Sequence, residues 1–391
     1  MKSYIPYGKQ SIDKSDIDAV NSVLNSDWLT TGPLVNKFEE ALAARVGSHY
    51  CVVFSSGTAA LHAAYYSAGI KTGDEIITTP ITFAATANAA LYLGAKPVFV
   101  DIGVNSLHVD IDKLEAAITS KTKVIAPVDM AGMPAHLDEI LSIAAANNLT
   151  VIEDACHALG ATYKGKPVGS ISDMSVFSFH PVKLITTGEG GAVTTDNEDY
   201  YHSLQRFRSH GIVRDSALFS GVYDKDDLQS GWYHEQQSLG FNYRLPDINC
   251  ALGLSQLQRL DSFLKRRREI AACYNYAFRD YDRFYLPPEP LGENSLQESA
   301  WHLYILRLAS DSPGRRNALM RSLADKGVGT QVHYIPVYLH PYYENLGYQK
   351  GLCPNAEDYY RRCFTIPLYP AMSDEDVERV IEALIVFGDI Y

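Results

Sequence analysis

The sequence has no long apolar run, no clustered cysteines and no excess of positive charge. No uninterrupted apolar stretch approaches the roughly 20 residues that a bilayer-spanning helix needs, and residues 1–14 lack the apolar core of a secretion signal. We therefore expect a cytoplasmic protein that does not bind membranes. Lys and Arg total 34 against 46 Asp and Glu, a net charge of −12, which argues against non-specific binding to nucleic acid.

Several familiar motifs are absent or incomplete. The six cysteines form no Cys-x-x-Cys pair, which predicts reduced thiols rather than a disulfide framework or a zinc cluster. Ser238 stands where a zinc-protease helix needs its second histidine, so we predict no metal site. Pro167 replaces the Mg²⁺-binding hydroxyl of a P-loop, and Val193 replaces the third glycine of a dinucleotide fingerprint.

Short apolar runs alternate with helix-like segments between residues 50 and 195. The chain has 391 residues, 46% hydrophobic and 20% charged, which is typical of a globular protein of two or more domains. Strands that are apolar throughout and separated by helices predict an α/β fold with a mainly parallel sheet between helices. The expected strands are 51–54, 75–78, 97–100, 124–128 and 150–153, and the expected helices are 59–68, 83–93, 112–118 and 137–147.

The pattern changes in the C-terminal part. Residues 210–237 show little periodicity, which predicts a long loop that is functional or mobile. Residues 248–276 read as one long helix. We place a domain boundary near Ala251, so that 1–250 form a large α/β domain with an N-terminal arm and 251–391 a smaller α+β domain. In the smaller domain we expect strands at 302–308 and 330–333 and helices at 315–326 and 374–387.

Four motifs lie at the ends of expected strands, where parallel sheets bind their ligands. The first, Ser55-Ser56-Gly57-Thr58, precedes an apolar helix. Free N–H groups at a helix start, its dipole and the hydroxyls can bind an anion, although a simple helix cap is the alternative. The second motif, in residues 153–157, ends a strand with two carboxylates and a histidine, and a helix cap is again the alternative for Asp154 alone.

The third and fourth motifs carry a lysine and an arginine. Lys183 leaves an aromatic strand just before a glycine-rich turn at 188–191. Burial there would lower the pKa of its amine toward a nucleophilic free base, whereas a solvated lysine is the alternative. Asn242 and Arg244, after the long loop, could cap a helix or bind phosphate.

Together these motifs resemble the fold-type I pyridoxal-phosphate (PLP) aminotransferases of the DegT/DnrJ/EryC1/StrS family, which act on nucleotide-linked keto sugars. The resemblance extends from residues 30–33 to residues 331–334. Within the family, the strings at 178–183, 207–211 and 331–338 are similar to members that aminate C4 of a UDP-linked 4-keto-6-deoxy sugar in pseudaminic-acid biosynthesis.

The resemblance implies roles for individual residues. Lys183 matches the lysine that binds the cofactor covalently and moves the substrate proton, and Asp154 matches the carboxylate that pairs with the pyridine nitrogen. Phe83 matches the aromatic residue that stacks on the ring, with core packing as its alternative, and His157 matches a side chain near the phenolic oxygen. The implied phosphate contacts are Ser56, Gly57, Thr58 and Ser178 from the same chain and Asn242 from a neighbouring subunit, which implies a homodimer with shared active sites.

The resemblance also implies a substrate and a donor. The candidate substrate-binding residues are Thr31, Arg208, His210, Arg214, Arg244, His333 and Tyr334, with residues 210–237 as a flap over the substrate. We expect ping-pong transamination of UDP-2-acetamido-2,6-dideoxy-4-hexulose at C4 with L-glutamate as the donor. A dTDP- or GDP-linked sugar, amination at C3 or C4 of such a sugar, and a non-catalytic PLP-binding regulator are the alternatives. Relatives that dehydrate sugars carry histidine at the position of Lys183, so lysine favours transamination.

Overall fold

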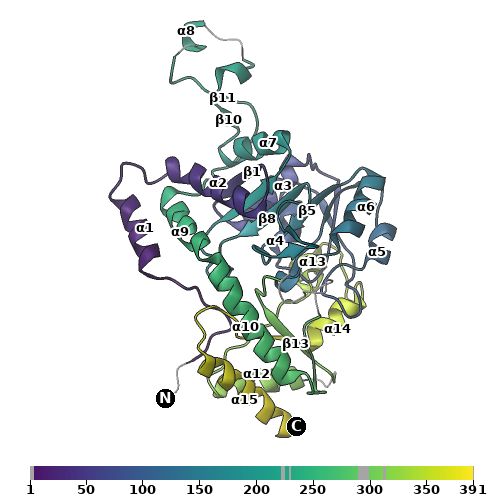
Figure 1. The fold of residues 1–391 in the computed structure, drawn as a ribbon. Helices are drawn as coiled ribbons and strands as arrows, with labels where there is room; N and C mark the ends of the chain where they lie inside the picture. Colours follow the sequence, from purple (N-terminus) through teal and green to yellow (C-terminus); the bar gives the residue numbers. More distant parts are fainter. Residues whose placement is uncertain (1–3, 222–224, 229, 289–298, 311–313, 391) are drawn as a thin grey trace.

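A seven-stranded, mainly parallel sheet forms the centre of the larger part of the molecule (Figure 1). The computed structural model describes residues 4–221, 225–228, 230–288, 299–310 and 314–390. In spatial order the strands are β1 (Tyr50–Phe54), β9 (Gly191–Thr195), β8 (Met174–Ser178), β5 (Thr150–Asp154), β4 (Thr122–Ala126), β2 (Glu75–Thr78) and β3 (Lys96–Phe99). Within this sheet only β9 runs opposite to the others, because it pairs antiparallel with both β1 and β8. The predicted α/β class is confirmed.

Helices cover both faces of the sheet, which explains why its strands are apolar throughout. In β1, Cys51 and Val53 pack with Phe38 on one face, whereas Val52 and Phe54 pack with Ala60 on the other. The first face is covered by α2 (Pro33–Val46), α9 (Asp247–Gln258), α5 (Ile111–Ala116) and α6 (Leu137–Asn147). The second is covered by α3 (Gly57–Ser67), α4 (Ala85–Tyr92) and α7 (Glu198–Arg208).

The segment 248–276 is helical as predicted, but it forms two helices instead of the single long helix that we expected. Helix α9 ends at Gln258, and α10 (Leu260–Phe278) begins after Arg259, whose φ is −101° and ψ 0°. The Arg259 guanidinium lies 2.7 Å from Asp13 and also pairs with Asp16 of α1 (Lys14–Leu24). The break therefore lies where a side chain binds an N-terminal segment distant in sequence, which the apolar periodicity does not reveal.

The described residues between 210 and 237 form a projecting arm with only short regular elements, in agreement with the long connection of little periodicity predicted there. Strands β10 (Ile212–Val213) and β11 (Glu235–Gln236) pair antiparallel at its base, and α8 (Lys225–Leu228) lies at its far end (Figure 1). Residues 222–224 and 229 lie outside the described residues. Glu235 accepts hydrogen bonds from the N–H groups of Ser220 and Gly221, at 2.8 and 2.9 Å, which ties the two sides of the arm together.

The C-terminal part has its own antiparallel sheet. It consists of β12 (Phe284–Tyr285), β13 (Tyr304–Leu308) and β14 (Cys363–Ile366), packed with α10, α12 (Arg315–Asp325) and α15 (Asp374–Ile390). The shorter helices α13 (Pro341–Asn345) and α14 (Pro354–Arg362) adjoin it. The strand expected at 330–333 is wrong, because only Gln331 pairs, in an isolated bridge with Thr365.

The two-domain division stays a prediction. Position 251 lies inside α9, which packs against α1 and α2, and the N-terminal Ile5 pairs with Val328 in the C-terminal part. None of the described helices has the length and apolar character to cross a bilayer.

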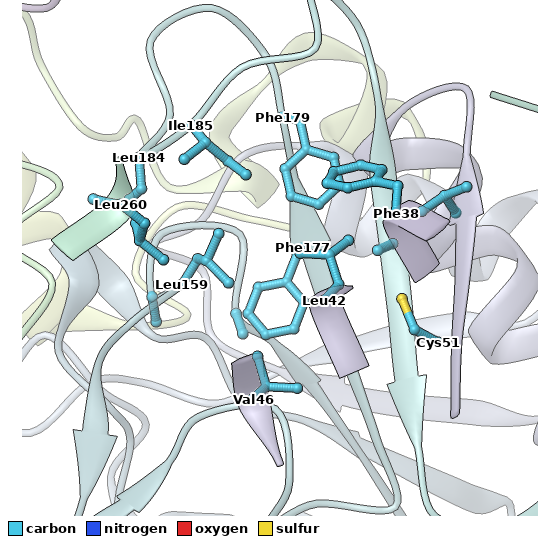
Figure 2. Packing of buried hydrophobic residues seen from close by; sticks show 14 of the residues in the cluster. Phe38, Leu42, Val46, Cys51, Leu159, Phe177, Phe179, Leu184, Ile185 and Leu260 are labelled. Carbon is cyan, nitrogen blue, oxygen red and sulfur yellow. The ribbon is translucent and has the colours of Figure 1, made fainter. Parts of the chain in front are cut away.

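A packed apolar layer lies beneath the turn that carries Lys183. Leu184 and Ile185, which follow this lysine directly, are buried with Phe179 and Phe38 (Figure 2). The Lys183 N–H donates to the His180 carbonyl at 2.8 Å, which closes the turn. The lysine is therefore presented on a tight turn whose following residues are anchored in the core.

Replacing this anchor should destabilise the protein. Leu184→Ala removes a side chain that is 3% exposed and should cost about 2–5 kcal/mol of stability because it leaves a cavity. The measurement is the shift of the thermal and urea unfolding midpoints. Val104→Ala, at a position that is 73% exposed, is the control and should leave both midpoints nearly unchanged. Equal shifts in the two variants would contradict the anchoring role.

Candidate active site

A cavity of about 720 Å³ lies beyond the carboxyl ends of five parallel strands. Residues at or just after the carboxyl ends of these strands, β1, β2, β4, β5 and β8, line its walls. Parallel sheets commonly bind ligands at this edge. The C-terminal part closes the cavity with residues 331–335 and His302. Ten of the predicted site residues line it, namely Ser56, Gly57, Thr58, Phe83, Asp154, His157, Ser178, Lys183, His333 and Tyr334.

Lys183 places an amine in this cavity with few charged neighbours. Burial lowers its pKa, and the nearby groups of Cys156 and Asp154 oppose this shift in part. A lowered pKa increases the share of the free amine, which is the nucleophilic form. The direction of this pKa shift agrees with the partial desolvation predicted for this lysine, whose side chain is half-buried.

Asp154 ends β5, and two hydrogen bonds hold its side chain. Its Oδ2 accepts a hydrogen bond from Thr86 Oγ1 at 2.6 Å, and its Oδ1 accepts one from the Cys156 N–H at 3.3 Å. The sequence analysis missed Thr86. The signal was present, because Thr86 follows Phe83 by three residues, the spacing that places two side chains on one face of a helical turn.

Ser56, Gly57 and Thr58 form the start of α3 beside the cavity. Ser56 Oγ accepts from the Ala59 N–H at 3.1 Å, so this serine caps the helix. The first N–H groups of a helix have no partner inside it, which leaves the backbone at Gly57 and Thr58 suited to an anion. A Cβ atom at Gly57 would lie only 3.0 Å from the Cβ of Ser178, so the two backbones meet closely here.

Phe83 is not a core residue. Its side chain lines the cavity and is 62% exposed, although phenylalanine side chains are most often buried. Its ring centroid lies 6.2 Å from that of Tyr334. Core packing, the alternative in the sequence analysis, is therefore excluded within this chain, and the exposed ring offers a flat apolar wall.

His157 is neutral, and its hydrogen bonds select one tautomer. Its Nδ1 accepts from the Ala131 N–H at 3.3 Å, so the proton belongs on Nε2, which lies 3.4 Å from the Tyr334 hydroxyl oxygen. Burial holds the pKa of His157 well below its usual range, with Lys183 and His333 adding to the effect. Burial also lowers the pKa of His333 to about 3. A neutral, oriented imidazole therefore faces the cavity.

These residues fit the chemical groups of PLP. The Lys183 amine, the Asp154 carboxyl group, the exposed Phe83 ring and the helix start at Gly57 face one space. In that order, these four groups could bind the aldehyde, the ring nitrogen, the ring face and the phosphate of PLP.

Six predicted site residues lie outside this cavity within the described part of one chain: Thr31, Arg208, His210, Arg214, Asn242 and Arg244. Arg208 is engaged elsewhere, because its guanidinium binds Glu39 and the Val53 carbonyl. Asn242 is exposed and pairs with Ser209 in an isolated antiparallel bridge. The carbonyl of the next residue, Tyr243, accepts from the Ser55 N–H at 2.7 Å. The structure does not bring these six to the Lys183 cavity, and their roles stay predictions.

Fold and cavity define a fold-type I PLP-dependent aminotransferase. The chain belongs to the DegT/DnrJ/EryC1/StrS aminotransferase family, whose model matches residues 10–385.

Relatives cover nearly the whole chain. The spore coat polysaccharide biosynthesis protein SpsC of Bacillus subtilis is 42% identical over 384 residues, 97% of this chain and 96% of that protein. The UDP-4-amino-4,6-dideoxy-N-acetyl-beta-L-altrosamine transaminase of Campylobacter jejuni is 41% identical over 383 residues, 97% of this chain and 96% of that one. Among solved structures, Helicobacter pylori PseC, an aminotransferase involved in the biosynthesis of pseudoaminic acid, superposes with a TM-score of 0.91 at 33% identity, over 100% of both chains.

A solved structure also represents the cofactor-bound state of a relative. The PLP form of the putative sugar aminotransferase Spr1654 from Streptococcus pneumoniae has a TM-score of 0.90 at 33% identity and covers 99% of each chain. The present chain is therefore a PLP-dependent sugar aminotransferase, which transfers an amino group to a nucleotide-linked sugar.

The close approach at Gly57 generates a test of the phosphate site. Gly57→Ala should weaken PLP binding at least about tenfold, because the added methyl enters the space beside Ser178. The unfolding midpoint of the cofactor-free variant measures separately how far the contact with Ser178 offsets the better helix propensity of alanine. The measurement is an absorbance titration with PLP. Gly8→Ala, whose Cβ would meet Val182 at an ordinary 3.7 Å, is the matched control, and equal affinity in both variants would contradict the assignment.

Proposed function

We propose that this aminotransferase aminates C4 of UDP-2-acetamido-2,6-dideoxy-4-hexulose with L-glutamate as the amino donor. Two observations support the substrate: a relative 41% identical is named as a UDP-4-amino-4,6-dideoxy sugar transaminase, and a structural neighbour is named for pseudoaminic acid. The observation that carries the chemistry is the meeting of Lys183 and Asp154 in one cavity.

The residues of the cavity divide the work of binding PLP. Lys183 would bind its aldehyde, Asp154 its ring nitrogen, Phe83 its ring face, and the backbone at Gly57 and Thr58 its phosphate. Bound in this way, PLP supplies an electron sink for the exchange of an amino group. The hydrogen bond from Thr86 fixes the Asp154 carboxylate in one orientation, so its negative charge can keep a ring nitrogen protonated.

Lys183 is also the proposed proton carrier. Its amine lies in the cavity and its pKa is lowered, so as a free amine it would be able to accept a proton from the substrate carbon. A positioned general base of this kind contributes roughly 10²–10⁴-fold to rate. The neutral His157, with Nε2 protonated toward Tyr334, is a hydrogen-bond donor on the same wall and orients the Tyr334 hydroxyl toward an oxygen of cofactor or sugar.

The proposed homodimer rests on what one chain leaves exposed. The arm at 210–237 projects from the body, and Leu218, Trp232 and Leu239 on or beside it are 51%, 64% and 74% exposed (Figure 1). Apolar side chains gathered in this way are typical of a surface that another chain covers. In the proposed dimer, Asn242 reaches the phosphate of the other subunit, and His210, Arg214 and Arg244 approach its substrate.

A substrate panel tests the proposed reaction. L-Glutamate should convert the visible spectrum of the holoenzyme to that of the pyridoxamine form, which a non-catalytic PLP-binding regulator would not do. The converted enzyme should then aminate the UDP-linked 4-keto-6-deoxy sugar with kcat/KM at least about tenfold above that for dTDP- and GDP-linked 4-keto sugars. Product position and stereochemistry are determined by NMR. Amination of 3-keto sugars alone would contradict the proposal.

A mixing experiment tests the shared site. Lys183→Ala and Asn242→Asp should each lose most activity as homodimers, the second because a carboxylate repels the cofactor phosphate. If Asn242 acts across the interface, a hybrid dimer has one site carrying both substitutions and one site carrying neither. A 1:1 mixture that re-equilibrates should therefore recover about a quarter of wild-type activity. A mixture of Arg244→Ala and Asn242→Asp is the control. In the proposed dimer one chain contributes both residues to the same site of the other subunit, so each site of a hybrid dimer carries one substitution and no intact site forms. Absence of recovery in the first mixture would contradict the shared site.

A further inference from the structure

Two buried carboxyl groups lie behind Asp154 and take no part in the proposed reaction. Glu153 precedes Asp154 on β5, and Asp129 lies on the segment after β4; both side chains are 0% exposed. Because side chains alternate along a strand, Glu153 points to the sheet face covered by α6 and Asp154 to the face covered by α3. The pair therefore lies outside the Lys183 cavity.

Each carboxyl has one oxygen with donors and one without. Asp129 Oδ1 accepts from the Ala135 N–H at 2.9 Å, and Glu153 Oε2 accepts from Ser175 Oγ at 2.8 Å and Ser172 Oγ at 3.3 Å. Within the described residues, Asp129 Oδ2 and Glu153 Oε1 have no donor from any other group. The two side chains are within hydrogen-bonding reach of each other.

We infer that Asp129 and Glu153 share one proton, with Asp129 Oδ2 donating to Glu153 Oε1, and that this pair positions Asp154 from the opposite face of the sheet. One proton satisfies both unpaired oxygens at once, whereas two carboxylates would leave both unsatisfied and repel each other. The catalytic part of this inference rests on the proposed role of Asp154.

The surroundings place the proton on Asp129. Burial raises the pKa of Asp129 well above its usual range, and the neighbouring Glu153 adds to that shift. Burial also raises the pKa of Glu153, but the hydroxyl groups of Ser175 and Ser172 oppose this by donating to its carboxylate. The other charged group that faces the pair is Asp154, which disfavours a second negative charge there.

Backbone hydrogen bonds connect the pair to Asp154. The Asp129 N–H donates to the Asp154 carbonyl at 3.1 Å, and the Asp154 N–H donates to the Pro127 carbonyl at 2.8 Å. The side-chain bond between Asp129 and Glu153 closes a second link between the same two segments. Two kinds of hydrogen bond thus join the ends of β4 and β5: the backbone bonds of Asp154 itself and the proton shared by the neighbouring Asp129 and Glu153. Together they fix Asp154, the residue against which a ring nitrogen would bind.

Infrared spectroscopy of the holoenzyme tests the proton. The difference spectrum between wild type and Asp129→Asn should contain the C=O stretch of a protonated carboxylic acid, shifted in D₂O. Glu153→Gln should keep the band but shift it, because Asp129 stays protonated by burial and then donates to a neutral amide oxygen instead of a carboxylate. Asp138→Asn, at a side chain 57% exposed, is the matched control and should show only carboxylate bands. Persistence of the band in Asp129→Asn, or its absence from wild type, would overturn the shared proton.

Stability against pH gives an independent readout. A carboxyl whose pKa is raised by folding stabilises the native state most below its ordinary pKa, and that stability is lost as pH rises through the raised value. Asp129→Asn keeps a donor for Glu153 but cannot ionise, so its unfolding midpoint should exceed that of wild type increasingly as pH rises. A constant difference across the pH range would count against the inference.

The positioning role is tested by comparing two replacements of Asp129. Asp129→Asn should keep kcat within about twofold of wild type, because the amide donates in place of the acid. Asp129→Leu should lower kcat at least about tenfold with KM nearly unchanged, and it should shift the pH titration of the visible band of the holoenzyme. Equal kcat in the two variants would overturn the positioning role. If no sugar nucleotide were a substrate, the infrared and pH measurements would still decide the proton itself.

Discussion

The buried carboxylate of Asp154 is the interaction on which the site depends. A carboxylate at the end of a central strand is costly to desolvate, and it is retained here by a short hydrogen bond from Thr86, the Cys156 N–H and the electrostatic influence of Lys183. Its position fixes the rest of the arrangement, because α4 supplies Thr86 and Phe83 together, and β8 leads through a closed turn to Lys183. The parallel sheet brings these elements to one edge, so groups far apart in the sequence, such as Ser56 and Lys183, serve one cavity.

Much of this arrangement could be predicted from sequence, because it depends on local patterns. The strand at 75–78 and the helix at 137–147 are confirmed at the predicted bounds, since each has an unbroken apolar pattern bounded by turn residues. Ten site residues reach the cavity because parallel strands end at the same edge. The break at Arg259, by contrast, comes from an ion pair with an N-terminal helix, and the bridge at Gln331 comes from pairing with Thr365. Both depend on contacts that no local pattern encodes.

Four of the six predicted site residues outside the cavity are exposed. Asn242, His210 and Arg214 are exposed on or beside the projecting arm, and Thr31 lies on another exposed segment. Within one chain their side chains have no route to the Lys183 cavity, so their proposed roles require a second subunit. Arg208 differs from them, because it binds Glu39 and a strand carbonyl in its own chain. Its guanidinium supports the packing of α2 against β1 and α7, a structural role that the sequence pattern did not distinguish from substrate binding.

The dipeptide Glu153-Asp154 shows how one strand can serve two environments. Alternation along β5 sends the two carboxyls to opposite faces, so neither needs to share its hydrogen-bond donors with the other. On the cavity face, the negative charge is useful because a ring nitrogen can neutralise it. On the opposite face no cationic group is among the described neighbours that shift the pKa of Asp129 or Glu153, and in the inferred arrangement a proton on Asp129 takes that place. In the proposed arrangement the two carboxyls are therefore neutralised by different partners, a ring nitrogen for Asp154 and a proton shared with Asp129 for Glu153.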